Sequence, residues 1–470
     1  MIEIHSTQKV REAEEAFFEA HPDVDLMQRA ADGVAQAALR MIGDHVTDAP
    51  VLVAAGPGNN GGDGLYAAAR LAAAGCRVAF WLTSGRAHEA GLAAARAAGC
   101  QEVNATAATE ALAETYLLVD AVLGIGGRPG LDRVVATLAA EAQALGVQVL
   151  CVDQPSGLAA DLGTVTAECF QATRTITFSV LKPCHVLQPA ARCCGTVEVY
   201  DIGLSITEEP VAVQAEVADI ARLWPVPGPS SHKYSRGVVG IDTGSSRYPG
   251  AAVLGTIGAL HAGTGMIRFV GPEAAAALIR TQLPSVTQGE GGVQAWLLGS
   301  GWGQTEANKD RLASRLAAGL PSVIDADALL TLPDTVPANS LLTPHAGEMS
   351  RMLGVKREQV ETDPLWYARE AADRWNAVVL LKGATQYVVE PDGKVRLAVP
   401  GPHWSAQAGS GDVLAGICAA LLAGGLSASD AALLGASVQA MAARRKRGPW
   451  PPDVVGREVA AVVADFDPFW

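Results

Sequence analysis

A run of glycines, amides and an acid at residues 56–64 has the composition of a site that holds an anionic ligand. It reads Gly-Pro-Gly-Asn-Asn-Gly-Gly-Asp-Gly and lies between an apolar run, residues 51–55, and an alanine-rich helical segment. Glycines let backbone N–H groups approach phosphate oxygens, and the start of the following helix adds its positive end. A turn shaped only for packing is the alternative, but the two amides and the aspartate favour a binding site.

Two later apolar runs also end in acidic residues. Asp120 precedes a second glycine-rich stretch, residues 124–130, and Asp153 begins the segment Asp-Gln-Pro-Ser-Gly. A single aspartate at a strand end is usually a helix cap or a loop anchor. Because the carboxyl ends of parallel strands meet at one edge of a sheet, three polar clusters at such ends predict a shared ligand site.

A third acid with a chemical context lies near the C-terminus. Residues 407–412 read Gln-Ala-Gly-Ser-Gly-Asp and lead into a helical segment, which places Asp412 in the first turn beside glycine N–H groups. Those groups form an anion hole, and a carboxylate there can take a proton from a hydroxyl group. A helix cap with packing glycines is the alternative interpretation.

Two common nucleotide-binding classes do not fit. No G-x-x-x-x-G-K-[ST] motif occurs, which excludes the P-loop nucleotide hydrolases. The second apolar run ends in Phe-Trp-Leu-Thr at residues 80–83, without the acidic residue that holds the ribose in dinucleotide-dependent dehydrogenases. Ordinary hydride transfer is therefore disfavoured.

The elements that position these residues alternate along the chain. Short apolar runs at residues 51–55, 77–82, 116–120, 147–152, 173–179 and 196–200 are separated by alanine-rich helical segments. This alternation predicts a mostly parallel sheet covered by helices, preceded by a helical layer in the first fifty residues.

The length of 470 residues predicts two domains, 1–210 and 211–470. A proline-rich stretch, residues 224–230, is interpreted as the entry to the second domain. Further apolar runs follow, and the chain is expected to end with two alanine-rich helices. The second series comprises residues 238–241, 266–270, 296–298, 322–324, 378–381, 387–389 and 395–398, with the helices at 412–422 and 428–444.

Bulk composition limits the partners. A formal charge of -14 opposes a nucleic-acid-binding surface. The basic run at residues 444–447 is interpreted as the C-terminal turn of a helix, where cations are favourable, rather than as a nucleic-acid patch. No leader-like start and no apolar run of membrane-spanning length occur, and the eight cysteines show no C-x-x-C pair. We expect a soluble cytoplasmic protein that does not bind membranes.

The motifs of residues 1–205 resemble the NAD(P)H-hydrate epimerase family, whose hallmark is the loop at residues 56–64 with a strand-end aspartate and a later D-x-P-S-G. The resemblance implies that Asp153 is the catalytic proton-transfer group. Gln154 stands where this family has isoleucine or leucine. The resemblance implies a potassium ion held by Asn60, Asp120 and Ser156. The implied substrate-binding residues are Asn59, Asn60, Gly61, Gly62, Asp63, Gly124, Ile125, Gly126, Gly127, Arg128, Pro129 and Gly130.

Residues 225–465 resemble the NAD(P)H-hydrate dehydratase family of the ribokinase-like superfamily. The similarity rests on Tyr-Pro-Gly-Ala at 248–251, Gly-Ser-Gly-Trp-Gly at 299–303, Thr-Pro-His at 343–345 and the Gly-Ser-Gly-Asp at 409–412. The resemblance implies that Asp412 is catalytic. The implied substrate-binding residues are Ala251, Gly301, Gly303, His345 and Asp412. The implied ADP-binding residues are Lys382, Gly383, Ala384, Thr385, Gln386, Gly409, Ser410 and Gly411. The threonine of the family's K-G-x-x-T stands one position early here.

The two resemblances together imply an α/β protein with a Rossmann-like three-layer domain followed by a ribokinase-like domain. The first would interconvert the R and S hydrates NADHX and NADPHX at C6, by ring opening or by hydroxide loss, through Asp153. The second would use Asp412 and ADP with Mg²⁺ to phosphorylate the C6 hydroxyl of the S hydrate, and elimination would release NADH or NADPH, AMP and phosphate. We expect a homo-oligomer. The alternatives are a small-alcohol kinase with a regulatory module and a non-catalytic metabolite sensor.

Overall fold

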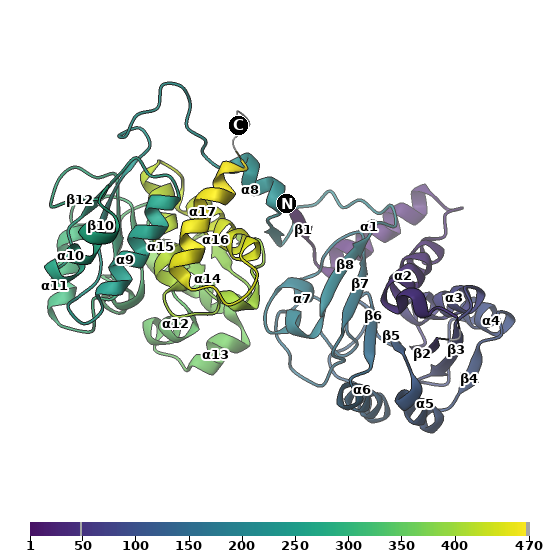
Figure 1. Cartoon of the computed structure of the whole chain (residues 1–470). Helices are drawn as coiled ribbons and strands as arrows, with labels where there is room; N and C mark the ends of the chain where they lie inside the picture. The colour runs from purple at the N-terminus through teal and green to yellow at the C-terminus, as the bar shows by residue number, and fades with distance from the viewer. Residues whose placement is uncertain (48, 467–470) are drawn as a thin grey trace. The chain divides into compact units, whose positions relative to one another are not determined.

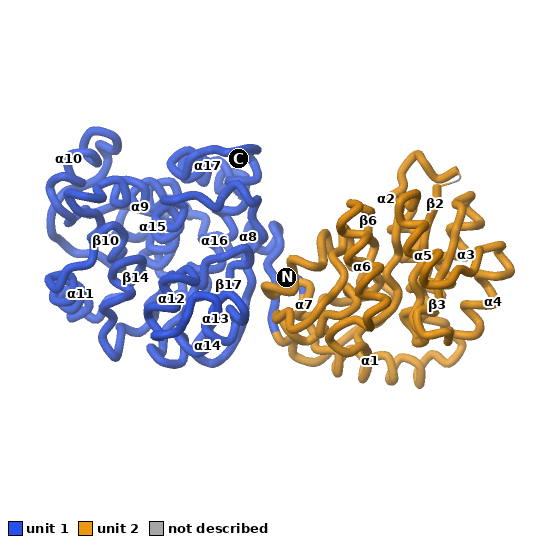
Figure 2. The backbone as a smooth tube through the Cα atoms, turned by 90° about the horizontal axis from the view of Figure 1, so that it is seen from below, with its two compact units in different colours: residues 1–2, 212–470 blue, residues 3–211 orange. Residues whose placement is uncertain are grey.

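The computed structural model describes residues 1–47 and 49–466 (Figure 1). They form two compact units, residues 3–211 and residues 1–2 with 212–470 (Figure 2). Each unit has its own sheet, and each is an α/β structure, as the alternation of apolar and helical segments predicts.

The sheet of the unit formed by residues 3–211 is parallel throughout, with the strand order β4-β3-β2-β5-β6-β7-β8. The chain adds strands in one direction from β2 and then in the other from β5. A crevice forms outside the carboxyl ends of strands where this order reverses, so ligands of such folds bind there. The strands are β2 (Pro50–Ala55), β3 (Arg77–Leu82), β4 (Gln101–Val103), β5 (Leu117–Ala121), β6 (Gln148–Val152), β7 (Arg174–Phe178) and β8 (Thr196–Tyr200).

Helices cover both faces of this sheet, because successive strand residues point to opposite sides. Val51 and Val53 pack in one core with residues of α2 and α3, whereas Leu52 and Ala54 pack in another with residues of α5 and α6. The prediction that the first fifty residues are helical is wrong at β1 (Ile2–Ile4), a strand too short for periodicity to reveal. The helices are α1 (Thr7–Ala20), α2 (Leu26–Ile42), α3 (Asn59–Ala73), α4 (Glu89–Ala97), α5 (Ala105–Ala111), α6 (Arg133–Leu145) and α7 (Pro183–Val186).

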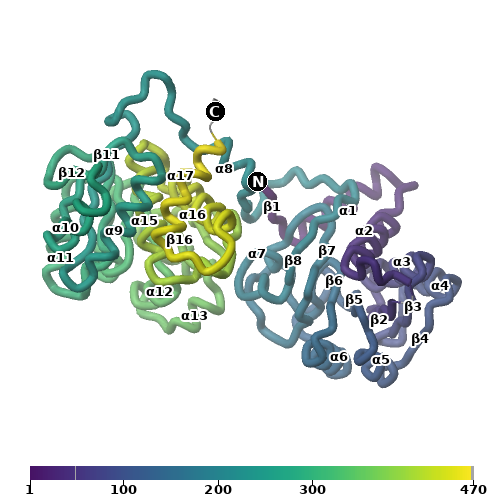
Figure 3. The backbone as a smooth tube through the Cα atoms, viewed as in Figure 1, coloured from purple at the N-terminus to yellow at the C-terminus, as the bar shows by residue number. Residues whose placement is uncertain are grey.

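The sheet of the other unit runs β9-β18-β17-β16-β15-β14-β13-β10-β11-β12. Its order reverses between β10 and β13, and β17 is antiparallel to both of its neighbours. Figure 3 follows the chain through these strands. The strands are β9 (Ala212–Gln214), β10 (Val238–Asp242), β11 (Met266–Phe269), β12 (Thr287–Gln288), β13 (Ala295–Leu298), β14 (Ser322–Ile324), β15 (Leu341–Leu342), β16 (Val378–Leu381), β17 (Tyr387–Val389) and β18 (Val395–Leu397).

One face of this second sheet supports an almost wholly apolar helix, α15, which packs against α9 and α16. The expectation that two helices end the chain is wrong, because α17 follows and packs on α9 and α16. Its preceding prolines conceal the start of a further helix. The helices are α8 (Val217–Leu223), α9 (Pro249–His261), α10 (Glu273–Gln282), α11 (Ala307–Leu316), α12 (Ala346–Leu353), α13 (Arg357–Thr362), α14 (Pro364–Trp375), α15 (Ser410–Ala423), α16 (Ala428–Arg445) and α17 (Pro452–Ala464).

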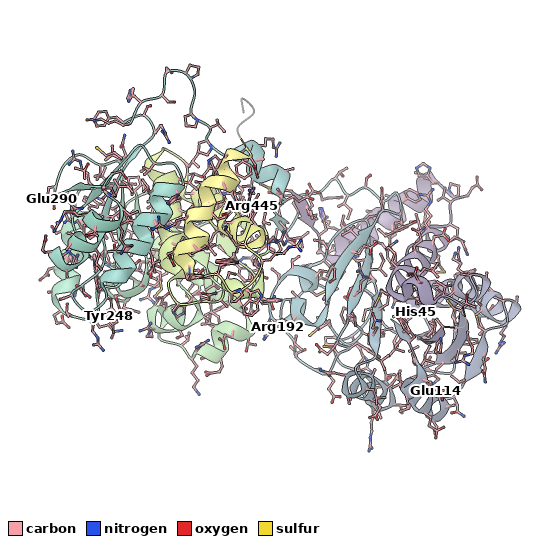
Figure 4. The ribbon with its side chains drawn as sticks, viewed as in Figure 1. His45, Glu114, Arg192, Tyr248, Glu290 and Arg445 are labelled. Atoms are coloured by element: carbon pink, nitrogen blue, oxygen red, sulfur yellow. The ribbon has the colours of Figure 1, made fainter. Side chains whose placement is uncertain are left out.

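The basic run ends a helix, as predicted from its sequence. Arg445 is the last residue of α16 and forms ion pairs with Glu458 and Asp465 (Figure 4). Lys446 pairs with Glu458 and lies over the ring of Trp450. Acidic groups therefore neutralise part of this run.

Candidate functional site

The glycine-rich segment after β2 is a tight turn into α3. Asn59 begins this helix and Gly58 is its N-cap, so the first-turn N–H groups are free to bind an anion. A Cβ atom on Gly61 would lie 1.9 Å from the carbonyl oxygen of Gly56, which explains why glycine is needed there. The segment thus forms a tight glycine-rich turn into a helix, as its composition predicts.

Asp153 lies at the end of β6 with its carboxylate held by donors from three segments. Oδ1 accepts hydrogen bonds from Lys182 Nζ at 2.8 Å and Thr177 Oγ1 at 3.0 Å, and Oδ2 accepts one from Ile125 N at 3.1 Å. The backbone of Asp153 has a φ of 66°, a left-handed conformation unusual outside glycine. Such backbone strain is common where a side chain must be aimed into a site.

Charges around Asp153 act on the protonation of several carboxyl groups. Burial raises the pKa of Asp153, but the ammonium group of Lys182, together with His185 and Thr177, outweighs burial and leaves the pKa below its ordinary value. The pKa of Asp63 is well above its ordinary value because of burial, with repulsion from Asp153 and Glu14 adding to it. Burial and repulsion from Asp153 also raise the pKa of Glu14. The unit therefore separates an ionised carboxylate from two that favour their protons.

The three residues implied to hold potassium come from different strand ends. Asp120 is fully buried, and its carboxylate accepts hydrogen bonds from Ser156 Oγ at 2.6 Å and Ser156 N at 2.8 Å. Burial raises the pKa of Asp120 to about 6, although these hydrogen bonds oppose the rise. The side-chain Nδ2 of Asn60 is buried and has no hydrogen-bond partner among residues 1–47 and 49–466. Asp120 and Ser156 thus lie together, and Asn60 has unused polar capacity.

A cavity of about 510 Å³ lies at the reversal of the strand order, within the size range of small-molecule sites. Gly61 and Gly62 are buried in the first turn of α3. The predicted site residues that lie outside the described lining of this cavity are Gly61, Gly62, Asp120, Arg128, Pro129, Gly130 and Ser156. The predicted residues that line the cavity are Asn59, Asn60, Asp63, Gly124, Ile125, Gly126, Gly127 and Asp153.

Sequence analysis missed several residues of this cavity. Lys182 and Glu14 line it, as does Arg11, whose side chain donates to the carbonyl of Ile125. Lys182 follows β7 at the same edge of the sheet as the other strand ends, so its position was a usable signal. The helix α1 offered none, because its face toward the cavity looks like any amphipathic surface.

The second site is built at the carboxyl ends of β13 to β16. Asp325 follows β14, and its carboxylate accepts hydrogen bonds from Ser300 Oγ, Thr343 Oγ1 and Lys382 Nζ, each at 2.8 Å. The Nζ atom of Lys382 also lies 3.7 Å from Glu348 Oε2. Four strand ends therefore converge on one buried charged group, the carboxylate of Asp325 with its partner Lys382.

Asp412 lies in the first turn of α15 and faces this charged group. Burial raises its pKa to about 7, repulsion from Asp325 adds to the rise, and the ammonium group of Lys382 opposes it. A Cβ atom on Gly411 would lie 3.1 Å from Lys382 Nζ, so the glycine lets α15 approach the lysine closely. A carboxyl group with a pKa near neutrality suits proton transfer at physiological pH.

His345 has a structural role in the described chain. It is the N-cap of α12, and its Nδ1 accepts hydrogen bonds from Gly347 N at 2.9 Å and Glu348 N at 3.2 Å. Burial lowers the pKa of His345, whereas Glu348 opposes that change. The neutral ring also lines the cavity, so capping does not remove it from the site.

The cavity at this second site measures about 640 Å³. Ala251 is the third residue of α9, close after the exposed Tyr248 labelled in Figure 4, and Gly303 N donates to Asp327. Four of the predicted site residues lie outside the described lining of this cavity: Ala251, Gly301, Gly303 and Thr385. Sequence analysis missed Gln407 and Gln439, which belong to it. The predicted lining residues are His345, Lys382, Gly383, Ala384, Gln386, Gly409, Ser410, Gly411 and Asp412.

Two family models match the chain, one in each unit. Residues 23–184 match the YjeF-related protein N-terminus, and residues 239–449 match NAD(P)H-hydrate dehydratase. The bifunctional NAD(P)H-hydrate repair enzyme Nnr of Mycobacterium leprae is 39% identical over 468 residues, an alignment that covers 96% of this chain and 95% of that protein. The chain belongs to the bifunctional NAD(P)H-hydrate repair enzyme family. This membership confirms the family that the sequence motifs indicate.

A second repair enzyme matches at lower identity. The Escherichia coli repair enzyme Nnr is 32% identical over 411 residues, covering 83% of this chain and 80% of that protein. The agreement spans both units and disfavours the two alternatives, a small-alcohol kinase and a sensor.

Solved structures bear on the dehydratase half of the repair enzyme. A Bacillus subtilis ADP/ATP-dependent NAD(P)H-hydrate dehydratase, co-crystallised with ATP/Mg²⁺, matches with a TM-score of 0.52 and 26% identity, covering 55% of this chain and 99% of that one. A ribokinase-like superfamily protein of Enterococcus faecalis matches with a TM-score of 0.50 and 17% identity, covering 56% and 99%. The predicted ribokinase-like fold is confirmed. No helix in the described part of the chain has the length and apolar character needed to span a membrane.

Proposed function

We propose that the unit of residues 3–211 interconverts the R and S forms of NADHX and NADPHX, and that the other unit dehydrates the S form with ADP. The products of the second reaction are NADH or NADPH, AMP and phosphate. The observation that carries this proposal is the placement of Asp153 and Asp412, one in each ligand-sized cavity, beside the glycine-rich start of a helix. Membership of the repair-enzyme family supports it.

In the epimerase site, the substrate's phosphates bind the turn at residues 56–64 and the loop at 124–130, and Asp153 moves the proton at C6. A potassium ion fits the donor set, because the side chains of Asn60, Asp120 and Ser156 each offer an oxygen atom to a hard cation. The ion would neutralise Asp120 and favour anionic ligands nearby.

In the dehydratase site, Asp412 takes the proton of the C6 hydroxyl while the hydroxyl oxygen attacks the β-phosphate of ADP. The N–H groups at the start of α15 stabilise the transferring phosphoryl group. Lys382 offsets the negative charge of the nucleotide. Elimination then follows, because the ring nitrogen expels the phosphate. Magnesium bound with the nucleotide would neutralise phosphate charge, and the cavity carboxylate of Glu348 suits its preference for oxygen ligands.

We also propose that the chain works in the cytoplasm as a homo-oligomer, without nucleic-acid or membrane partners. Its formal charge of -14 supports the exclusion of nucleic acid. Sedimentation velocity measures the oligomeric state directly, and a single monomeric species would contradict that part of the proposal.

The test of both activities uses the full chain with mixed R and S hydrates of NADH. Adding ADP and Mg²⁺ should restore the absorbance of reduced nicotinamide to the level of complete conversion, because epimerisation feeds the R form into dehydration. Conversion of only the S fraction would refute the epimerase assignment. No conversion by folded protein would refute the dehydratase assignment.

A further inference from the structure

Lys182 is the buried cation of the epimerase cavity, and the proposed reaction gives it no role. Only 1% of its surface is exposed, although it follows β7 directly before the short helix α7. Its Nζ atom lies 2.8 Å from both Asp153 Oδ1 and Thr177 Oγ1. A lysine with so little access to water is costly unless it is paired, so this ion pair is a built feature of the site.

The same segment also holds the backbone of Asp153. His185 Nδ1 accepts a hydrogen bond from Lys182 N at 3.0 Å, so its ring proton is on Nε2, which lies 2.8 Å from the carbonyl oxygen of Asp153. Lys182 therefore contacts the carboxylate of Asp153, and His185 contacts its backbone carbonyl. This double contact accounts for the left-handed backbone of Asp153 being held in place.

The surrounding charges make the lysine decisive for the state of Asp153. The titratable groups that interact with this carboxylate are Glu14 from α1, Asp63 from α3, and Lys182, Cys184 and His185 from the segment at α7, and Arg11 from α1 lines the same cavity. Two of them are further carboxyl groups, and both raise the cost of a negative charge. Lys182 is the cation in direct contact with Asp153, at 2.8 Å.

We propose that Lys182 is a positioning residue of the epimerase site, which holds Asp153 ionised so that it enters the reaction as a base. This inference rests on the proposed epimerase function. Lys182 fixes Oδ1, and Oδ2 is left on the side of Ile125, whose N–H lies 3.1 Å away in the substrate loop. Without the ammonium group, the largest influence that opposes burial is lost and only the weaker effects of His185 and Thr177 remain, so the pKa of Asp153 rises.

An ionised Asp153 selects ring opening over hydroxide loss. The carboxylate takes the C6 hydroxyl proton, the C6–O bond becomes a carbonyl, and the C6–N1 bond breaks with its electron pair moving to N1. The proton then passes from the Asp153 carboxyl to N1, so atoms and charge balance. Closure on the other face of the aldehyde reverses these steps and gives the other epimer. Hydroxide loss would instead require a protonated acid at this position.

The test is the pH dependence of kcat/KM for epimerisation by the full chain, with the uncatalysed rate subtracted at each pH. For the unmodified enzyme we expect no acid-side fall above about pH 5, because the pKa of Asp153 is low. Lys182→Met should move the acid limb to higher pH by at least one unit, so that the rate at a pH within that limb falls about tenfold and recovers as the pH rises. Lys182→Arg keeps a positive charge, so its acid limb should stay close to that of the unmodified enzyme. Lys9→Met, at a partly exposed lysine of the same unit that pairs with Glu12 and not with Asp153, is the matched control.

Several outcomes would overturn the inference. If Lys182→Met lowers the rate equally at every pH, the lysine is only structural. If that variant does not fold, the profile of the unmodified enzyme still decides, because an acid limb centred above about pH 6 contradicts an ionised Asp153. Retention of ¹⁸O from a labelled C6 hydroxyl is expected, whereas exchange with water in each turnover refutes ring opening. An unmodified enzyme without epimerase activity refutes the proposed function instead.

Discussion

Asp412→Asn separates proton abstraction from ligand binding in the dehydratase site. The substitution keeps the size and much of the hydrogen-bonding shape of the side chain at the third position of α15, but it removes the basic oxygen. General-base contributions are about a hundredfold to ten-thousandfold. We expect ADP-dependent dehydration to fall by that amount, while ADP affinity and epimerisation stay within a few-fold of the unmodified enzyme.

The pH dependence of the same variant follows from the raised pKa of Asp412. Burial raises it to about 7, so in the unmodified enzyme the dehydration rate should increase with pH up to about 7 and then level off. The residual rate of Asp412→Asn should lack that rise, because asparagine does not titrate. A nucleotide bound beside Asp412 adds negative charge and raises the pKa of Asp412 further. The acid limb in the pH profile of kcat should therefore lie at higher pH than the acid limb in the profile of kcat/KM.

Stability provides an independent check with a defined sign. The folded state holds a proton on Asp412 that the unfolded chain releases above its ordinary pKa of 3.8. The unmodified enzyme therefore loses stability as pH rises from about 4 to about 7. A difference of three pKa units corresponds to about 4 kcal/mol as an upper limit. Asp412→Asn should consequently be more stable than the unmodified enzyme at pH 8 and equal to it near pH 3.5.

Dehydration rate, ADP affinity by calorimetry, epimerisation rate and urea unfolding at the two pH values should be measured on one preparation. Dehydration within a few-fold of the unmodified rate would show that Asp412 is not the base. A loss of dehydration together with a loss of ADP binding would assign Asp412 to ligand binding and contradict the argument.

The remaining predictions concern the modular units, the proposed ion site and the nucleotide. A fragment of residues 1–210 should interconvert R and S hydrates without nucleotide, because its cavity is formed within residues 3–211; a need for ADP would refute this. Asp120→Ala should abolish stimulation of epimerisation by potassium chloride over choline chloride, whereas undiminished stimulation would remove Asp120 from the ion site. Lys382→Met should weaken ADP binding about tenfold to a hundredfold by calorimetry, since it deletes a charged donor, and unchanged affinity would exclude that contact.

Much of the fold and of both sites was predictable from local sequence. The period of apolar residues revealed most strands of three residues or more. Glycine-rich turns marked the starts of the helices that contain Asp63 and Asp412. These features are local, because glycine content and strand alternation act through neighbouring residues. Strands of two residues, such as β12 and β15, and the proline-flanked α17 were missed because their formation depends on packing partners far along the chain.

The family, the two-site architecture and the acids at the strand end and the helix start follow from the sequence alone. The protonation of these acids depends on the fold. Asp153 and Asp412 look alike in the sequence, yet the pKa of one lies below its ordinary value and that of the other is about 7. The difference arises because burial and the placement of Lys182 and Lys382 depend on residues brought together from separate strands.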